Sequence, residues 1–315
     1  MRILITGGNG YVGRTLTRSL AGRHDVRVLD SLRGGGLRFA HEELSGFGLD
    51  QADIRDADAV AAVMSDFAPE VIVHLAAIHY IPECEAHPDE AVSINTLGTV
   101  NLLRAAPRGS RFVLASTAAV YAPEDRPHEE SGSPIGPMDV YGLTKLHAEQ
   151  YVRYYAPERD LDARIVRLFN VVGPGETNPH LLPAILAQAL HGTRTLHLGN
   201  TTPSRDYVHV QDVADGFAAV ALGERRVDGV DLVNLGTGVG WTVDQVVDQL
   251  SSVIGERLTV ETDPSRVRAV DRPHLAASTD LMAEHYGWRA RRTLEDSLRD
   301  LWADPDIPAS LLERS

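Results

Sequence analysis

A glycine-rich turn near the start of the chain constrains the fold more than any other feature. The apolar run at residues 2–6 leads directly into GGNGYVG, and a helical pattern follows over residues 11–22. Glycines between a strand and a helix allow a tight turn, let backbone N–H groups approach a phosphate, and let the helix pack closely on the strand. The N-terminus of that helix also attracts an anion. The sequence therefore predicts a βαβ unit that binds a dinucleotide.

An acidic residue stands at the end of the next predicted strand. Asp30 closes the apolar run at residues 26–30. A carboxylate there can bind the hydroxyls of an adenosine ribose and would repel a 2′-phosphate, which favours NAD over NADP. The neighbouring Arg33 leaves NADP as an alternative. An ordinary glycine-rich turn would not need this acid, so the two features together favour a dinucleotide site.

Strand and helix patterns alternate over the first 170 residues. Short apolar runs predict strands, and amphipathic segments between them predict helices. Such alternation is typical of parallel βαβ units in a doubly wound α/β sheet, the Rossmann arrangement. Beyond the first two, strands are predicted at residues 71–76, 111–116 and 164–169, and a helix at residues 56–67.

The second half of the chain is less regular. Helical patterns occur at residues 178–192 and after Thr293, and Thr242 with Gln245 has the spacing of a capping box at a helix start. Fewer apolar runs lie between them, which predicts a smaller mixed α/β C-terminal domain. We expect an NAD-binding domain at residues 1–170 with a return segment at about 204–240, and a mainly substrate-binding domain at 171–315.

The composition of the chain limits its partners. A net charge of −14 disfavours nucleic acid and an anionic membrane surface. No apolar run reaches the ~18 residues of a membrane span and no signal-peptide pattern is seen, so we expect a cytoplasmic protein. The single cysteine, Cys84, excludes an internal disulfide, and the histidine spacing predicts no metal site.

The segment YGLTK contains the only lysine of the chain, Lys145, four residues after Tyr141. Positions four apart share one face of a helix, and Asp139 could cap such a helix at its N-terminus. A phenol has a pKa of about 10 and is a poor base at neutral pH, but a nearby ammonium favours the phenolate. A chance pair on a surface helix is the alternative, and the glycine turn argues against it.

Several sequence blocks follow one another in an order typical of one family. They are GGNGYVG, ADIRD, HLAA, VLASTAAVY, YGLTK, RLFNVVGPG, PSRDYVHVQDVADG and VNLGTG. With them the sequence resembles the extended short-chain dehydrogenase/reductases, specifically the NAD-dependent nucleotide-sugar epimerases and dehydratases. The resemblance runs from Arg2 to about Leu298. It implies NAD as the cofactor, a nucleotide sugar as the substrate and a homodimer as the assembly.

The resemblance also implies which residues contact the cofactor. They lie in the glycine turn, at the ends of the predicted strands and in the helical segment after the fourth strand. They are Gly7, Gly10, Tyr11, Val12, Gly13, Asp30, Asp53, Ile54, Leu75, Ala76, Ala77 and Asn95, together with Tyr141 and Lys145.

By the same resemblance the catalytic groups are Thr117, Tyr141 and Lys145. Tyr141 takes the proton from a sugar hydroxyl while a hydride leaves the same carbon for NAD, and Lys145 hydrogen-bonds the nicotinamide ribose. The Thr117 hydroxyl, just before a small-small-Val-Tyr run, would bridge the substrate oxygen and Tyr141. Ser116 is the alternative for that position and is expected to be structural, because adjacent residues on a strand face opposite ways.

Two alanines narrow the choice among the reactions of this family. Relatives that eliminate water carry an acidic pair where this chain has Ala118 and Ala119, and decarboxylases carry a glutamate at the second position. Two methyl groups cannot move protons, so a 4-epimerase acting on a UDP-hexose or UDP-hexuronate through a transient 4-keto sugar is favoured. A nucleotide 4-ketohexose reductase remains open, and a 4,6-dehydratase is less favoured. A non-catalytic NAD-binding regulator is a remote alternative.

The substrate side of the resemblance rests on fewer residues. Arg205 and Arg268 match arginines that grip the diphosphate, which suits the bidentate geometry of a guanidinium. Asn170 matches an asparagine at the same diphosphate, and His180 stands where relatives contact the base. Leu275 replaces a tyrosine that narrows the sugar pocket of some hexose epimerases, so a larger sugar is expected to fit.

Overall fold

The computed structural model describes residues 1–176, 178, 180–225, 229–266 and 272–303. The elements of the first half are β1 (Arg2–Thr6), α1 (Tyr11–Leu20), β2 (Asp25–Asp30), η1 (His41–Gly46), β3 (Gly48–Gln51), α2 (Ala57–Phe67), β4 (Val71–His74), α3 (Ile81–Ala86), α4 (Pro88–Val92), η2 (Ser93–Leu97), α5 (Gly98–Ala105), β5 (Arg111–Thr117), η3 (Ala118–Val120), α6 (Val140–Arg159) and β6 (Asp162–Leu168).

The second half contains shorter strands between its helices. Its elements are β7 (Asn170–Val172), α7 (Leu181–Leu190), β8 (Thr195–Leu198), β9 (Ser204–His209), α8 (Val210–Leu222), β10 (Val230–Leu235), β11 (Gly240–Thr242), α9 (Val243–Ile254), β12 (Thr259–Thr262), η4 (Pro264–Arg266), β13 (His274–Leu275), α10 (Asp280–Tyr286) and α11 (Leu294–Ala303).

Seven parallel strands form the main sheet in the order β10-β6-β5-β4-β1-β2-β3. The chain builds outward from β1 in one direction through β2 and β3, and from β4 in the other. This is the doubly wound Rossmann arrangement, and the order reverses between β1 and β4. Ligands bind such sheets outside the carboxyl ends of the strands at that point, where Gly7 and Leu75 follow the two strands.

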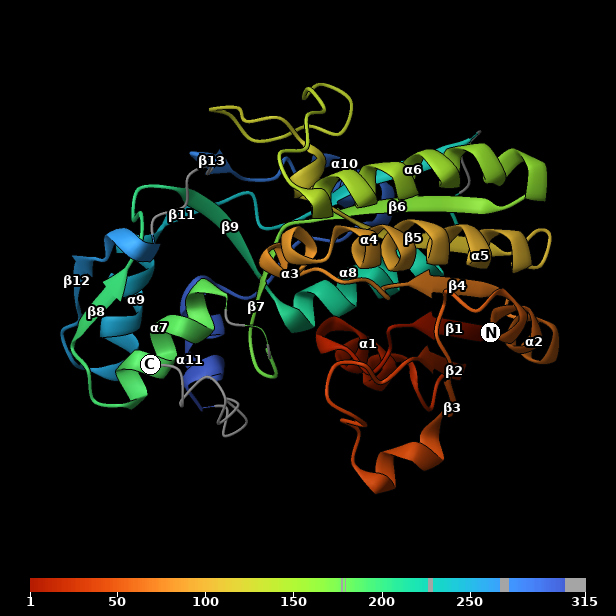
Figure 1. Ribbon diagram of the computed structural model, residues 1–315, viewed down its shortest axis with the longest axis horizontal. Helices are drawn as coiled ribbons and strands as arrows, with labels where there is room; N and C mark the ends of the chain where they lie inside the picture. The colour runs from red at the N-terminus through yellow and green to blue at the C-terminus, as the bar shows by residue number, and fades with distance from the viewer. Residues whose placement is uncertain (177, 179, 226–228, 267–271, 304–315) are drawn as a thin grey trace.

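Helices cover both faces of this sheet (Figure 1). In β1, Ile3 and Ile5 join the apolar core that contains the buried side of α1 and α8, while Leu4 joins the core on the side of α2, α5 and α6. This alternation follows from the two-residue period of a strand. All three side chains are fully buried, so the strand is apolar on both faces, as a central parallel strand should be.

The second layer lies at one end of the main sheet (Figure 1). It contains a sheet in which β9 pairs with β7, β11 and β13, and a two-stranded sheet of β8 and β12. A separate apolar core joins α7, α9 and α11 to these strands. Of the segment at 204–240, β9 lies in this layer, whereas α8 packs on α1 and β10 completes the main sheet.

The sequence pattern missed two strands of the main sheet. β3 is a short edge strand, GLDQ, whose side chains are at most half-buried, and its residues have little strand preference. β10 lies within the expected return segment at about 204–240, but no strand was predicted there. The predicted capping box at Thr242 is present, since its hydroxyl accepts from the Gln245 N–H and the Gln245 side chain accepts from the Thr242 N–H. Across the described residues, no helix combines the length and apolar character needed to cross a membrane.

Candidate active site

A large cavity of 1510 Å³ opens along the carboxyl ends of the strands and continues toward the second layer. Its walls include the turn after β1, the ends of β2, β4, β5 and β6, and the first turns of α6. Residues at 198–207 close the far side. Every site residue expected from the sequence and described by the structure lines this cavity, with one exception, Asn95. Arg268 lies outside the described residues.

The glycine turn has no room for side chains. Gly7 has a φ of +72°, and a Cβ there would lie 2.6 Å from the Ala76 backbone nitrogen. A Cβ on Gly13 would lie 2.1 Å from the Gly7 carbonyl oxygen. The Gly7 N–H donates to the Leu29 carbonyl at 2.9 Å, which ties the turn to β2. The exposed backbone at the start of α1 therefore fits the diphosphate of a dinucleotide.

Asp30 stands at the end of β2, where the turn can position it. Its carboxylate accepts from the Asn9 N–H at 3.0 Å and from the Leu32 N–H at 2.8 Å. The Asn9 side chain donates to the Gly36 carbonyl and accepts from the Arg38 N–H. Asn9 therefore fastens the loop after β2 to the glycine turn, a role that the sequence did not reveal although Asn9 stands inside the motif.

Arg33 is engaged by acids and does not weaken the case for NAD. Its guanidinium lies 3.0 Å from a Glu83 carboxylate oxygen and 2.9 Å from one of Glu90. Both partners come from the other side of the cavity, on α3 and α4. A guanidinium paired in this way carries less attraction for a 2′-phosphate, so the pairing favours NAD.

Asp53 and Ile54 border the cavity beyond β3. The Arg55 guanidinium binds the Asp53 carboxylate, with Nη2 to Oδ2 at 2.6 Å, and this hydrogen bond lowers the pKa of Asp53. Ile54 packs against Gly98, where a Cβ would lie 2.5 Å from the Ile54 Cδ1 atom. The pair is thus held in place from both sides.

Asn95 supports the loop after β4, and its contact with the cofactor stays a prediction. Its side chain is fully buried and does not line the cavity. The Asn95 Oδ1 accepts from the Ile78 N–H at 2.8 Å, and Nδ2 donates to the Ile78 carbonyl and to the Thr144 hydroxyl. These bonds hold the loop after β4, which carries Leu75, Ala76 and Ala77, against α6.

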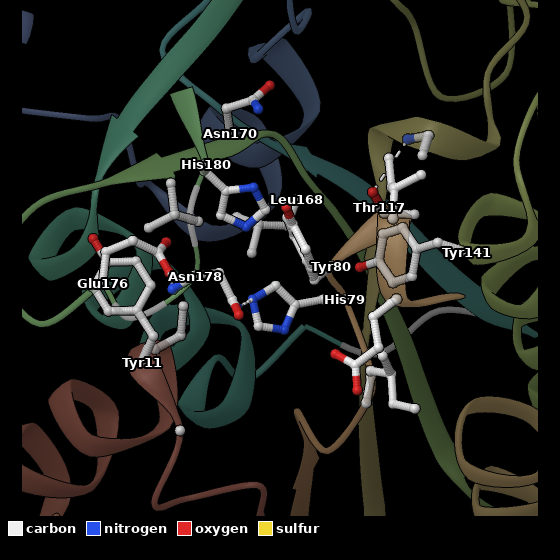
Figure 2. A pocket seen from close by; sticks show the side chains of 18 of the residues that line it. Tyr11, His79, Tyr80, Thr117, Tyr141, Leu168, Asn170, Glu176, Asn178 and His180 are labelled. Carbon is white, nitrogen blue, oxygen red and sulfur yellow. Dashed lines mark hydrogen bonds between the residues drawn. The ribbon is translucent and has the colours of Figure 1, made fainter. Parts of the chain in front are cut away.

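The predicted catalytic residues all line the cavity, and Figure 2 shows Thr117 and Tyr141 close together. Asp139 caps α6 as expected, because its Oδ1 accepts from the Gly142 N–H at 2.7 Å. Tyr141 and Lys145 follow one turn apart on that helix. Thr117 ends β5, and its hydroxyl acts to lower the pKa of the Tyr141 phenol. Thr117 also accepts from the Ala119 N–H at 3.1 Å.

Ser116, the alternative hydroxyl, has a different partner. Its Oγ donates to the Glu149 Oε1 at 2.6 Å. Glu149 is almost fully buried and also binds both ends of the Arg167 guanidinium, at 2.9 and 2.7 Å. The structure therefore favours Thr117 as the hydroxyl for the substrate. It also identifies Glu149 and Arg167 as a buried support that the sequence did not single out.

The pKa of Tyr141 differs from the expectation. Burial raises the pKa of the phenol, and the nearby Thr117 hydroxyl only partly opposes that effect. Burial lowers the pKa of Lys145 to about 8, against an opposing effect of the Glu149 carboxylate. In the protein alone, burial therefore decides the direction in which the pKa of Tyr141 moves.

The substrate half of the cavity contains Asn170, His180 and Arg205 as expected. The Arg205 Nη1 donates to the carbonyl of Arg272 at 2.7 Å. Arg272 was not singled out in the sequence, yet its side chain also lines the cavity. Leu275 lines the same part and packs with Tyr121 and Phe169, alongside the methyl groups of Ala118 and Ala119.

Three side chains of this half approach one another closely enough to hold a metal. The nearest ligand atoms of His79, Glu176 and His180 lie within 4.8 Å of one another, and Figure 2 shows them on one side of the cavity. His79 comes from the loop after β4 and the other two from the loop before α7, so spacing along the sequence could not reveal the group. The absence of a metal site stays a prediction.

Comparison with known proteins identifies the family. The family model described as the NAD dependent epimerase/dehydratase family matches residues 3–236. The UDP-glucose 4-epimerase of Azospirillum brasilense is 35% identical over 309 residues, which cover 91% of this chain and 86% of that protein. The UDP-glucose 4-epimerase of Corynebacterium glutamicum is 32% identical over 321 residues, which cover 96% of this chain and 95% of that protein.

A solved structure matches the fold of this chain over nearly its whole length. The UDP-glucose 4-epimerase of Stenotrophomonas maltophila, crystallised with bound NAD and formylated UDP-arabinopyranose, matches with a TM-score of 0.83 and 30% identity. The match covers 96% of this chain and 97% of that chain. The protein therefore belongs to the NAD-dependent epimerase/dehydratase family.

Proposed function

We propose that the protein is an NAD-dependent nucleotide-sugar 4-epimerase. The observation that carries this proposal is the meeting of Thr117, Tyr141 and Lys145 in a cavity that is continuous with the glycine turn and Asp30. A cofactor bound along that turn would bring its nicotinamide to the catalytic residues. The relatives described as UDP-glucose 4-epimerases support the same reaction.

The residues present fit NAD. Gly7, Gly10 and Gly13 line the cavity in a turn too tight for side chains, so the backbone there could approach the diphosphate, and Asp30 offers a carboxylate to the adenosine ribose. Lys145 lines the same cavity, where its amino group could bind the nicotinamide ribose. Bound NAD would supply reversible hydride transfer at C4 of the sugar, which permits inversion when the hydride returns to the opposite face.

The side chains of the protein move the proton that accompanies this change. Tyr141 takes the proton of the C4 hydroxyl and returns it, and Thr117 holds the same oxygen through its hydroxyl. Because burial raises the pKa of Tyr141, the phenol is protonated in the protein alone, and it must give up that proton before it can accept the one from the C4 hydroxyl. The neutral form of Lys145, one helical turn away and with a pKa of about 8, can accept the phenol proton near neutral pH. This arrangement suits a reversible transfer in which the proton taken from the sugar is returned to it.

The surroundings of Thr117 favour epimerisation over elimination. Ala118 and Ala119 present only methyl groups to the cavity, so they supply neither the acid nor the base that loss of water needs. A nucleotide 4-ketohexose reductase would use the same catalytic residues and is the second candidate. It differs by consuming external reduced cofactor.

The substrate side supports a sugar linked to a nucleoside diphosphate, for which we propose UDP-hexose or UDP-hexuronate. Arg205 and Asn170 line the half of the cavity beyond Thr117, where they could bind a diphosphate. Arg268 is expected to assist. We place the nucleotide-binding domain at residues 1–170 with the returning α8 and β10, and the substrate domain in the second layer.

A homodimer is the assembly that we propose. Four large apolar side chains are exposed on η2 and α6, two elements that pack on each other. They are Leu97, Leu143, Tyr151 and Tyr154. Burying these side chains against the same surface of a second copy would remove an apolar patch from water.

The test uses purified protein and a panel of UDP-, dTDP-, GDP- and CDP-linked sugars without added cofactor, followed by NMR. Appearance of a C4 epimer supports the epimerase. Turnover confined to mixtures of a 4-keto sugar and NADH would contradict it and select the reductase. Silence under both conditions with NAD still bound would favour the non-catalytic regulator.

A further inference from the structure

Arg272 connects the second layer to both catalytic elements. It precedes β13 and is 9% exposed. Its Nη2 donates to the Ala119 carbonyl at 2.9 Å, and its Nη1 lies 3.3 Å from the Asp139 Oδ2. One guanidinium therefore contacts the turn after β5 and the N-terminus of α6 at once. A planar fork suits two partners in this way, whereas an ammonium is a single point charge.

Each partner of Arg272 helps to fix the segment that carries a catalytic residue. Asp139 uses its other carboxylate oxygen to cap α6 through the Gly142 N–H, and Tyr141 lies between these two residues. The Ala119 N–H donates to the Thr117 hydroxyl at 3.1 Å. Arg272 thus reaches the Thr117 turn and the Tyr141 turn through one bond each.

The joint between the two turns is closely packed. A Cβ on Gly142 would lie 2.6 Å from the Ala119 carbonyl oxygen, so the helix can approach that peptide only because residue 142 is glycine. The same oxygen accepts the bond from Arg272. The carbonyl is held between the helix and the guanidinium. A shift of Arg272 would be transmitted to the distance between Thr117 and Tyr141.

Arg272 is also connected to the substrate end of the cavity. Its own carbonyl accepts from the Arg205 Nη1 at 2.7 Å. Arg205 is the residue that we propose for the diphosphate. A continuous series of contacts therefore runs from the proposed diphosphate site through Arg272 to the catalytic pair.

From this geometry we infer that Arg272 is a positioning residue of the reaction. It sets the distance between the Thr117 hydroxyl and the Tyr141 phenol. Through its contact with Arg205, it also makes that distance depend on the position of the Arg205 side chain. The inference rests on the proposed function. Arg272 acts through Asp139 and Ala119 and not on the reacting atoms.

The charge of Arg272 gives the inference a second readout. Cys84 on α3 and Asp139 at the cap of α6 are titratable groups that act on the pKa of Tyr141, Glu85 accepts from the Val140 N–H, and Arg272 lies 3.3 Å from Asp139. The Asp139 carboxylate acts to raise the pKa of Tyr141. Without Arg272 that carboxylate is less compensated, and the phenol should ionise at higher pH.

The experiment compares Arg272→Met, Arg272→Lys and a double variant that combines Asp139→Asn with Arg272→Met, each loaded with NAD. Both single variants should lower kcat about tenfold or more, with a smaller change in KM, because the two catalytic turns lose their common contact. The ascending limb of the kcat–pH profile should move to higher pH in Arg272→Met. It should return in the double variant, in which the amide side chain at position 139 still caps the helix but carries no charge.

The matched control is Arg289→Met, which removes an exposed arginine from the same half of the chain and should leave both constants unchanged. Wild-type kcat and pH profile in Arg272→Met would overturn the inference, as would a loss of thermal stability with no other change. Arg272→Lys keeps the test available if the methionine variant does not fold.

A measurement that needs no substrate separates this inference from the proposed reaction. The phenol of Tyr141 is titrated by ultraviolet difference absorbance between each protein and its Tyr141→Phe counterpart. A higher pKa in Arg272→Met than in the wild type supports the role of Arg272 even if no sugar is turned over. An unchanged phenol pKa contradicts it even if the epimerase activity is found.

Discussion

The Ser116 hydroxyl donates to the Glu149 carboxylate at 2.6 Å, while the neighbouring Thr117 hydroxyl faces the Tyr141 phenol. Two adjacent hydroxyls therefore serve different purposes. The Ser116 hydroxyl binds the carboxylate of the buried Glu149–Arg167 ion pair, and the Thr117 hydroxyl is the one that we propose for the reaction. The first prediction follows from this division.

We expect Thr117→Val to lower kcat about a hundredfold, because it removes a hydrogen-bond donor from the reacting oxygen while nearly keeping the side-chain volume. Ser116→Ala should leave kcat within about threefold. It should lower the free energy of unfolding by about 1–3 kcal/mol, since the Glu149 carboxylate loses one buried partner. Steady-state kinetics and urea unfolding measure both effects. Equal losses of kcat in the two variants would contradict the assignment of Thr117.

The lowered pKa of Lys145 should appear in the pH dependence of stability. Between pH 8 and about 10 the unfolded chain holds a proton that the folded Lys145 has lost, so the free energy of unfolding should rise with pH. The full effect is roughly 3 kcal/mol. Cys84 and Tyr141 have raised pKa values and act in the opposite direction at the upper end of this range. The difference between wild type and Lys145→Met therefore isolates the effect of the lysine.

Urea unfolding at several pH values between 7 and 10 checks this prediction. The wild type should gain stability relative to Lys145→Met as the pH rises through 8. Parallel curves for the two proteins would mean that Lys145 keeps an ordinary pKa in the folded state.

Breaking the buried ion pair of Glu149 and Arg167 should be costly. We expect Glu149→Gln to lower the free energy of unfolding by about 3–5 kcal/mol, because the Arg167 charge is left buried without its carboxylate. The control is Glu295→Gln, which breaks an exposed pair with Arg299 and should change stability by about 0.5 kcal/mol or less. Similar effects in the two variants would show that the buried pair contributes no more than a surface one.

Replacing Gly13 by alanine should abolish NAD binding. A Cβ at that position would lie 2.1 Å from the Gly7 carbonyl oxygen, so the turn would have to open. Gly46→Ala is the matched control, because its Cβ would meet only the Ala21 Cβ at 4.0 Å. NAD content after purification and titration of the stripped protein measure the effect. Normal NAD content in Gly13→Ala would exclude the glycine turn as the diphosphate site.

A charge placed in the apolar patch should separate the proposed dimer. Tyr151→Asp and Leu97→Asp are expected to shift the protein toward the monomer in analytical ultracentrifugation, because each buries an aspartate in the interface. Leu190→Asp, on an exposed part of α7, is the control and should not change the mass. A wild type that sediments as a monomer would contradict the proposed assembly.

Local patterns predicted much of the fold and of the catalytic site. The bounds of β1 agree with the predicted run at residues 2–6, since a strand with a continuous apolar centre is recognisable by itself. The four-residue spacing of Tyr141 and Lys145 and the cap at Asp139 needed only the geometry of one helix. β3 escaped because it is held by pairing with β2, and its own residues show little preference for a strand.

The sequence by itself determined the glycine turn, the acid at Asp30 and the order of the catalytic residues, because each depends on neighbours within a few positions. The tertiary structure decided which hydroxyl faces Tyr141, that Asn95 supports a loop, and that Arg272 joins the two catalytic turns. It also decided the direction of the Tyr141 pKa, since burial outweighs the opposing effect of the Thr117 hydroxyl. Burial and contacts between distant segments arise only when the chain packs, so no local spacing contains them.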